Sequence, residues 1–229
     1  MHMQASIQRN TFSQPMPRAA RAAAAPAPQF GESIELMGAV MPFARNAEIY
    51  GENEPAEYLY KVIGGAVRTY KVLNDGRRQI GSFYLPGDVF GLEIGDLHSF
   101  SAEAIVECKV MLIKRSTLLT LAARSHDVAN QLWTMTAKEL QRAQSHIMLL
   151  IKTAQERVAG FLLEMAARTP GCVAVELPMS RQDIADYLGL TIETVSRTLT
   201  QLENSAAISV PSSRRIVLRN HAALSRLNA

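Results

Sequence analysis

The spacing of hydrophobic residues changes along the chain, and the first pattern is typical of β-structure. Between Glu32 and Lys114, short apolar runs rich in Val, Ile and Tyr are separated by glycine-containing turns. Asn74-Asp75-Gly76 suits a hairpin because these residues tolerate positive φ, and Pro86-Gly87 suits a type II turn. Alternation within the runs is weak, so the turns are the stronger signal. The final run, residues 103–114, is long and rich in Val and Ile. This texture predicts an antiparallel roll or sandwich.

From Ser116 onward the apolar residues recur at helical spacing. A short helix is predicted over Ser116–Ala123 and a long one, free of Pro and Gly, over Asp127–Thr153. A third helix is predicted over Ala154–Ala167, and Thr169-Pro170-Gly171 should end it.

The long helix carries two rows of residues with sevenfold spacing, which together form an a/d seam. The rows consist of Trp133, Leu140 and Ile147, and of Thr136, Ala143 and Leu150. Such a seam packs best against a partner helix, so it predicts a homodimer. The alternative is that the helix lies on its own β-domain, and both can hold on different faces.

Residues 177–203 read as two short helices joined by a tight turn at Gly189. Ser180 is placed as an N-cap, with Asp183 three residues later at the positive end of the helix. Thr191 is placed to cap the second helix. The first helix should bury Ile184, Ala185 and Leu188.

The second helix of this pair separates apolar from polar residues. Its expected buried side consists of Ile192, Val195, Leu199 and Leu202, and its polar side of Glu193, Ser196, Arg197 and Thr200. Arg can donate two hydrogen bonds to guanine, Glu can accept one from cytosine, and Ser can approach a thymine methyl. The simpler alternative for Glu193 and Arg197 is an i,i+4 ion pair, worth about 0.2–0.5 kcal/mol on any exposed helix. The helix–turn–helix context favours base recognition by Glu193, Ser196 and Arg197.

Contacts to DNA phosphates are expected around the same element. After the second helix, residues 206–220 predict two strands around Ser212–Arg215, forming a wing. Hydroxyl groups, arginines and helix N-termini are the groups that hold backbone phosphates. The predicted phosphate contacts are Ser180, Arg181, Thr191, Thr194, Arg214 and Arg215.

The net charge of +3 says little about nucleic acid, because it comes entirely from three arginines in residues 1–31. The rest of the chain is balanced. From Asn204 to the end, however, there are four arginines and no acidic residue, so the basic character is local to the wing. Residues 1–29, rich in Ala, Pro and Gln, are predicted to be a disordered tail.

Cys108 and Cys172 have no spacing typical of zinc or iron–sulfur ligands, so we expect no metal and no cofactor. No window reaches the roughly 20 apolar residues of a membrane span, which predicts a cytoplasmic protein without a membrane partner. The chain lacks a phosphate-binding glycine loop and a recognisable catalytic set, so an enzyme is not expected.

The segment SRQDIADYLGLTIETVSRTLTQLE resembles the helix-turn-helix of the CRP–FNR family of transcription regulators, and Glu193, Ser196 and Arg197 resemble its FixK-like branch. The resemblance implies an α+β protein with an antiparallel, cyclic-nucleotide-binding-like β-roll, a long dimerisation helix and a C-terminal winged helix-turn-helix. The implied divisions are a tail at 1–29, the β-roll at 30–123, the dimerisation helix at 124–153 and the DNA-binding domain at 154–229. It further implies a homodimer that binds TTGAT-N4-ATCAA-like double-stranded palindromes, recruits RNA polymerase, and activates genes of low-oxygen respiration or nitrogen fixation.

Two departures from the family concern the signal. His98-Ser99 stands where cyclic-nucleotide binders carry an Arg that clamps the phosphate, with Glu93 nearby. The N-terminal cysteine cluster of the oxygen-sensing members is also absent from the sequence. We therefore expect a regulator that works without a cyclic-nucleotide effector. The alternative is a regulator gated by a small molecule, either a cyclic nucleotide or a haem.

Overall fold

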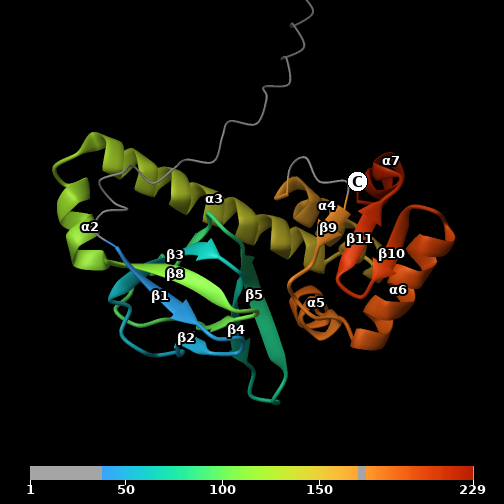
Figure 1. Cartoon of the computed structure of the whole chain (residues 1–229), viewed down its shortest axis with the longest axis horizontal. Coiled ribbons are helices and arrows are strands. Elements are labelled where there is room, and N and C mark those ends of the chain that lie inside the picture. The colour runs from blue at the N-terminus through green and yellow to red at the C-terminus, as the bar shows by residue number, and fades with distance from the viewer. Residues whose placement is uncertain (1–37, 170–173, 229) are drawn as a thin grey trace, which may run out of the picture.

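The computed structural model describes residues 38–169 and 174–228, and it shows an α+β architecture (Figure 1). A β-roll occupies one end of the molecule and a winged helix-turn-helix the other. The long helix α3 (His126–Leu150) runs across the top of the β-roll toward the helix-turn-helix. The predicted tail, residues 1–29, lies outside the described residues.

Two antiparallel four-stranded sheets form the β-roll, which confirms the predicted β-architecture. One has the order β1 (Ala39–Phe43), β8 (Cys108–Lys114), β3 (Tyr58–Gly64) and β6 (Val89–Phe90). The other has the order β2 (Glu48–Tyr50), β7 (Ser101–Ala104), β4 (Val67–Val72) and β5 (Arg78–Tyr84). An apolar core fills the space between the sheets, with Val62, Val67 and Val110 fully buried.

Both predicted turns occur. Asn74–Gly76 joins β4 to β5, with Gly76 at φ +83°, and Gly87 lies at φ +93° after Pro86. The long run 103–114, by contrast, is divided between β7 and β8, which belong to different sheets. The chain crosses between the sheets at residues 105–107, where the Ile105 amide donates to the Ala66 carbonyl at 2.9 Å.

The weak alternation in the β4 run has a structural cause. Val67, Arg68 and Thr69 are all buried. Val67 faces the core of the β-roll, whereas Arg68 contacts helix α5 (Arg181–Leu188). The first half of β4 is covered on both sides and has no solvent face, so its sequence does not alternate, whereas Lys71 and Val72 at its end are exposed.

The predicted helices are present within a few residues of their expected ends. α2 spans Arg115–Ala122, and α4 spans Ala154–Ala167 behind a capping box made by Thr153 and Glu156. Residues 170–173, where Pro170-Gly171 was expected to end α4, lie outside the described residues.

Helix α3 has two apolar faces, one buried and one exposed. Val128, Met135 and Leu149 are buried within the subunit. The seam residues lie on the other face, which is open to solvent: Trp133 is 75%, Leu140 59% and Ile147 62% exposed. The alternative of a helix lying on its own subunit therefore holds for one face, while the seam remains a predicted dimer contact.

The C-terminal region contains α5, α6 (Ile192–Asn204) and a three-stranded antiparallel sheet of order β10 (Ile208–Ser212), β11 (Arg215–Leu218) and β9 (Ala174–Glu176). The wing predicted around Ser212–Arg215 is confirmed. Strand β9 and helix α7 (His221–Leu227) were not predicted. Among the described residues, no helix has both the length and the apolar character needed to cross a membrane.

Candidate nucleic-acid interface

The ends of α5 and α6 are fixed by the residues that the sequence indicates. The Ser180 hydroxyl accepts from the Asp183 amide at 3.1 Å, and the Asp183 carboxylate accepts from the Ser180 amide at 2.9 Å. Gly189 lies in the left-handed region at φ +62°, and the Thr191 hydroxyl accepts from the Thr194 amide at 3.2 Å. These caps satisfy amides that a free helix end leaves without partners, so the angle between α5 and α6 is set locally.

Helix α6 has a buried face and an exposed polar face. Val195, Thr198, Leu199 and Leu202 are buried, whereas Glu193, Arg197 and Thr200 are exposed and Ser196 is half-buried. The prediction was wrong for Ile192, which is 37% exposed. It begins the helix directly after the turn and borders a cleft between the helix pair and the β4–β5 hairpin, so no core faces it. Thr198 occupies the buried face instead.

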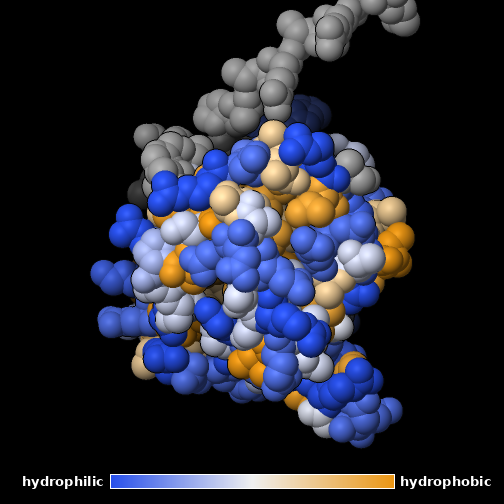
Figure 2. Space-filling model, turned by 90° about the vertical axis from the view of Figure 1, so that its right-hand side faces the viewer, coloured by the Kyte–Doolittle hydropathy of each residue, from blue (hydrophilic) through white to orange (hydrophobic). Residues whose placement is uncertain are grey.

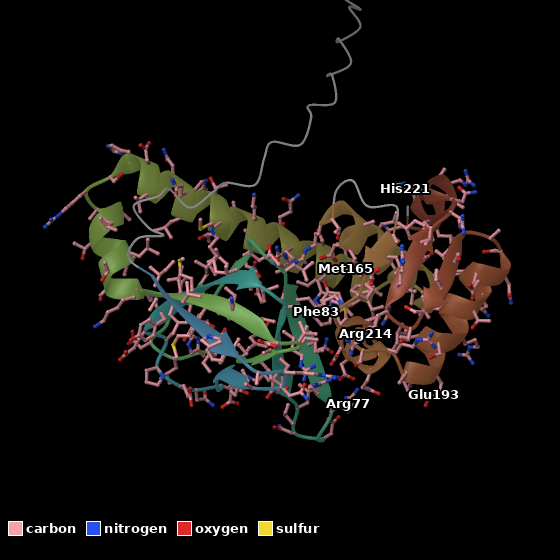
Figure 3. All side chains as sticks on the ribbon, viewed as in Figure 1. Arg77, Phe83, Met165, Glu193, Arg214 and His221 are labelled. Carbon is pink, nitrogen blue, oxygen red and sulfur yellow. The ribbon has the colours of Figure 1, made fainter. Side chains whose placement is uncertain are left out.

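Glu193 and Arg197 do not form the ion pair that was the simpler alternative. The Arg197 guanidinium instead lies 3.5 Å from the Thr194 hydroxyl. A hydrogen bond from the residue's own backbone amide, together with the Thr191 hydroxyl, lowers the pKa of the Glu193 carboxyl, so it is ionised at neutral pH. Glu193 lies at the lower edge of the helix pair, close to the hairpin that carries Arg77 (Figure 3). Both charged groups are therefore available to an external partner.

Ser196 and Arg181 are linked to each other. The Arg181 guanidinium donates to the Ser196 hydroxyl at 3.3 Å, and the buried Arg181 Nε has no partner among the described residues. The structure thus joins a residue predicted to contact phosphate to one predicted to contact a base. Nothing in the sequence spacing predicts this link.

The turn of the wing is basic, but its two arginines differ. Arg215 lies 3.4 Å from the Glu176 carboxylate, whereas the side chain of Arg214 has no acidic partner among the described residues. Both are exposed. The end of the molecule that carries α6 and the wing presents largely hydrophilic residues (Figure 2).

A buried ionic network attaches α5 to the β-roll. The Asp183 carboxylate accepts from Arg68 at 2.9 Å and from Arg78 at 2.6 Å, and Arg78 also reaches Asp186 at 2.8 Å. Arg68 extends the network to Glu103 at 2.8 Å. Sequence reasoning missed these contacts, because Arg68 and Arg78 lie more than 100 positions from the aspartates of α5 and no local pattern marks any of the pairs.

An apolar and aromatic contact accompanies this network. Tyr187 of α5 lies 5.1 Å from Phe83 of β5, measured between ring centroids, and stacks on His146 of α3 at 3.9 Å. The His146 ring is also 2.7 Å from the Tyr187 carbonyl. The helix that precedes α6 is therefore held by both the β-roll and α3.

The β-roll contains a cavity of about 230 Å³, which we call the β-roll cavity; among its lining residues are Tyr50, Tyr84, Phe90, Glu93 and Glu139. Its lining includes two carboxylates and no basic side chain, an environment that disfavours a phosphate. This lining therefore offers a cyclic phosphate no positively charged side chain.

His98 does not supply the missing positive charge. It is 1% exposed and stacks on Tyr50 at 3.6 Å. Burial lowers the pKa of His98, against the opposing effect of Glu93, so the ring is neutral at pH 7. The Ser99 hydroxyl donates to the Glu93 carboxylate at 3.1 Å.

The described residues contain no group of three His, Cys, Asp or Glu side chains that could hold a metal ion. Cys108 is buried, and burial raises the pKa of its thiol. Cys172 lies outside the described residues.

Two family models match the chain. Residues 40–125 match the cyclic nucleotide-binding domain, and residues 156–227 match the Crp-like helix-turn-helix domain. The nitrogen fixation regulation protein FixK of Azorhizobium caulinodans is 52% identical over 202 residues, covering 86% of this chain and 82% of the relative. FixK of Rhizobium meliloti is 40% identical over 203 residues, covering 88% and 90%. The structure of FixK2 from Bradyrhizobium japonicum matches with a TM-score of 0.81 at 54% identity, covering 84% of this chain and 98% of that one.

Proposed function

The chain belongs to the CRP–FNR family of transcription regulators, and we propose that it is a FixK-like homodimeric activator that binds TTGAT-N4-ATCAA-like palindromes without a cyclic nucleotide. Its proposed targets are genes of low-oxygen respiration or nitrogen fixation. Nitrogen fixation is the process that the names of its FixK relatives give. Because its proposed partners are DNA and RNA polymerase, its proposed place is the cytoplasm. We further propose the domain boundaries 1–29, 30–123, 124–153 and 154–229.

One observation carries this proposal: Glu193 and Arg197 are exposed on the polar face of α6 and are not paired with each other. In the proposed complex Arg197 binds guanine, Glu193 accepts from the cytosine on the opposite strand, and Ser196 approaches a thymine. The phosphate contacts are assigned to Ser180, Arg181, Thr191, Thr194, Arg214 and Arg215. Arg214 is the stronger candidate of the two wing arginines, because Glu176 partly neutralises Arg215.

The test of base recognition is Arg197→Ala. We expect it to lose about 1–3 kcal/mol of discrimination at the half-site guanine, measured as the ratio of affinities for the palindrome and for a duplex with that guanine replaced. Arg226→Ala removes the same charge from α7 and should leave the ratio unchanged. If the ratio of affinities in Arg197→Ala equals that of the wild type, the role assigned to Arg197 is wrong.

The proposed dimer contact is the seam of α3, which consists of Trp133, Thr136, Leu140, Ala143, Ile147 and Leu150; all are exposed except Leu150, which is half-buried. Ile147→Glu places a charge at an exposed apolar position of the seam and should convert the dimer to a monomer, measured by light scattering. Ser145→Glu adds the same charge on the same helix, away from the seam, and should leave the mass unchanged. A dimeric Ile147→Glu variant would show that the subunits associate elsewhere.

The absence of an effector is tested by a band shift with the purified protein and no added ligand. Binding of the palindrome under these conditions is the expected result. Binding that needs an added cyclic nucleotide or haem would instead support the alternative of a small-molecule-gated regulator.

A further inference from the structure

A second cavity, of about 220 Å³, lies between the β-roll and the winged helix-turn-helix. We call it the junction cavity and define it by Arg45, Arg68, Arg78, Ser180, Asp183 and Arg214. The β1–β2 turn, strands β4 and β5, the start of α5 and the turn of the wing each contribute to it. We propose that the junction cavity binds a phosphate-class oxyanion that joins the β-roll to the wing.

Charge is the first argument. Four guanidinium groups line the cavity against one carboxylate, that of Asp183. Both oxygens of this carboxylate are already used, because Oδ1 accepts from Arg68 and Arg78 while Oδ2 accepts from the amide and hydroxyl of Ser180. Asp183 is therefore largely neutralised toward an incoming anion.

Arg45 and Arg214 supply positive charge that the protein itself does not balance. Neither side chain has an acidic partner among the described residues, and both are exposed at the edges of the cavity. Arg68 and Arg78 are paired with Asp183, Glu103 and Asp186. A bound anion would therefore be attracted most strongly by Arg45 of the β-roll and Arg214 of the wing.

The origin of the guanidinium groups is the second argument. Arg45 follows β1, Arg68 and Arg78 belong to β4 and β5, and Arg214 lies in the turn of the wing, yet all four line the same cavity. Oxyanions offer several acceptor positions on one small group, which matches guanidinium donors that converge from different elements.

The size of the cavity limits the ligand. Water occupies about 30 Å³ per molecule in the liquid, so the cavity has room for several waters or for a phosphate group. The same chemistry is offered by a free phosphate and by a backbone phosphate of bound DNA, and the test separates these two sources.

The first measurement titrates inorganic phosphate and diphosphate into the full-length, DNA-free protein by calorimetry, with ionic strength held constant by chloride. We expect binding in the wild type and an affinity at least about tenfold lower in the double variant Arg45→Gln/Arg214→Gln, because charge-assisted hydrogen bonds are removed. The matched control is Arg124→Gln/Arg226→Gln, which removes two exposed arginines outside the cavity and should bind phosphate like the wild type.

A second variant tests the cavity without removing an arginine. Asn46 also lines the cavity and has φ +63°, a conformation that Asp tolerates. Asn46→Asp should weaken phosphate binding, because it places an unpaired carboxylate beside the anion.

The second measurement concerns DNA as the source. It compares affinity for a duplex that ends at the palindrome with affinity for one extended on both sides. Suppose that the wild type binds no free phosphate and that Arg45→Gln lowers the affinity for the extended duplex but not for the short one. This result would assign the cavity to DNA phosphates. If neither free phosphate nor extended DNA distinguishes the cavity variants from the control, the oxyanion site is refuted. Because the first measurement contains no DNA, its failure is separate from a failure of the proposed DNA-binding function.

Discussion

The β-roll cavity and the junction cavity have nearly the same volume, about 230 Å³ and 220 Å³, but opposite chemistry. The β-roll cavity occupies the domain that matches the cyclic nucleotide-binding family, yet it is lined by aromatic rings and two carboxylates. The junction cavity is lined by four arginines and one carboxylate. The comparison shows that, in this molecule, the cavity lined by positive charge lies between the two domains and not within the β-roll.

This difference also bears on how the helix-turn-helix is held. Helix α5 is attached to the β-roll by Asp183 and Asp186, which pair with Arg68 and Arg78. These ion pairs link the position of α5, and through the turn at Gly189 that of α6, to the β-roll residues of the junction.

The largest expected effect is a difference in stability between variants that neutralise a carboxylate in each of the two cavities. Asp183→Asn removes the charge that Arg68 and Arg78 share, and breaking a buried ion pair in this way costs about 3–5 kcal/mol. Glu93→Gln is the same kind of change in the β-roll cavity, where the main contacts of the carboxylate are to exposed Ser99, so we expect a loss below about 1 kcal/mol. Urea unfolding of both variants measures the free energies. Equal losses would contradict the structural importance assigned to the junction.

A smaller effect is expected from pH. Burial lowers the pKa of His98 and His146, so the unfolded chain binds more protons than the folded one in mildly acidic solution. Their contribution to stability is present above the ordinary histidine pKa of about 6.5 and is lost as pH falls through the lowered folded values.

Urea unfolding between about pH 7.5 and about pH 5.5, a range spanning the ordinary histidine pKa, measures this effect. The free energy of unfolding should fall by at most about 1.4 kcal/mol for each unit by which a histidine pKa is lowered. His98→Phe keeps a ring for stacking on Tyr50 and should reduce the pH dependence, whereas His221→Phe, at an exposed position, should not. An unchanged pH dependence in His98→Phe would mean that the ring is not neutralised by burial.

The smallest expected effect is the response to cyclic AMP. Excess cyclic AMP should leave the melting temperature and the affinity for the palindrome unchanged, because the β-roll cavity offers its phosphate two carboxylates and no cation. Inorganic phosphate, the proposed ligand of the junction cavity, serves as the positive control in the same melting experiment. If cyclic AMP raised the melting temperature and inorganic phosphate did not, the β-roll cavity and not the junction cavity would be the anion site.

Local rules were sufficient for much of the fold. Helix α4 spans Ala154–Ala167 as predicted, and Ser180, Gly189 and Thr191 take their predicted capping and turn positions. Each of these features depends on residues within about four positions of one another, through cap hydrogen bonds and backbone φ. The polar face of α6 followed from helical periodicity in the same way, except at Ile192, where the neighbouring cleft decided exposure.

The sequence by itself therefore determined most of the elements, though not β9 or α7, together with the helix pair and the residues proposed to read DNA. Only the tertiary structure decided that Arg68 meets Asp183 across 115 positions, that His98 is buried against Tyr50, and that Arg45 and Arg214 line one cavity. The physical reason is range. Capping and periodicity act along a few residues of chain, whereas the charge and burial of a cavity depend on which surfaces the packing of the whole chain brings together.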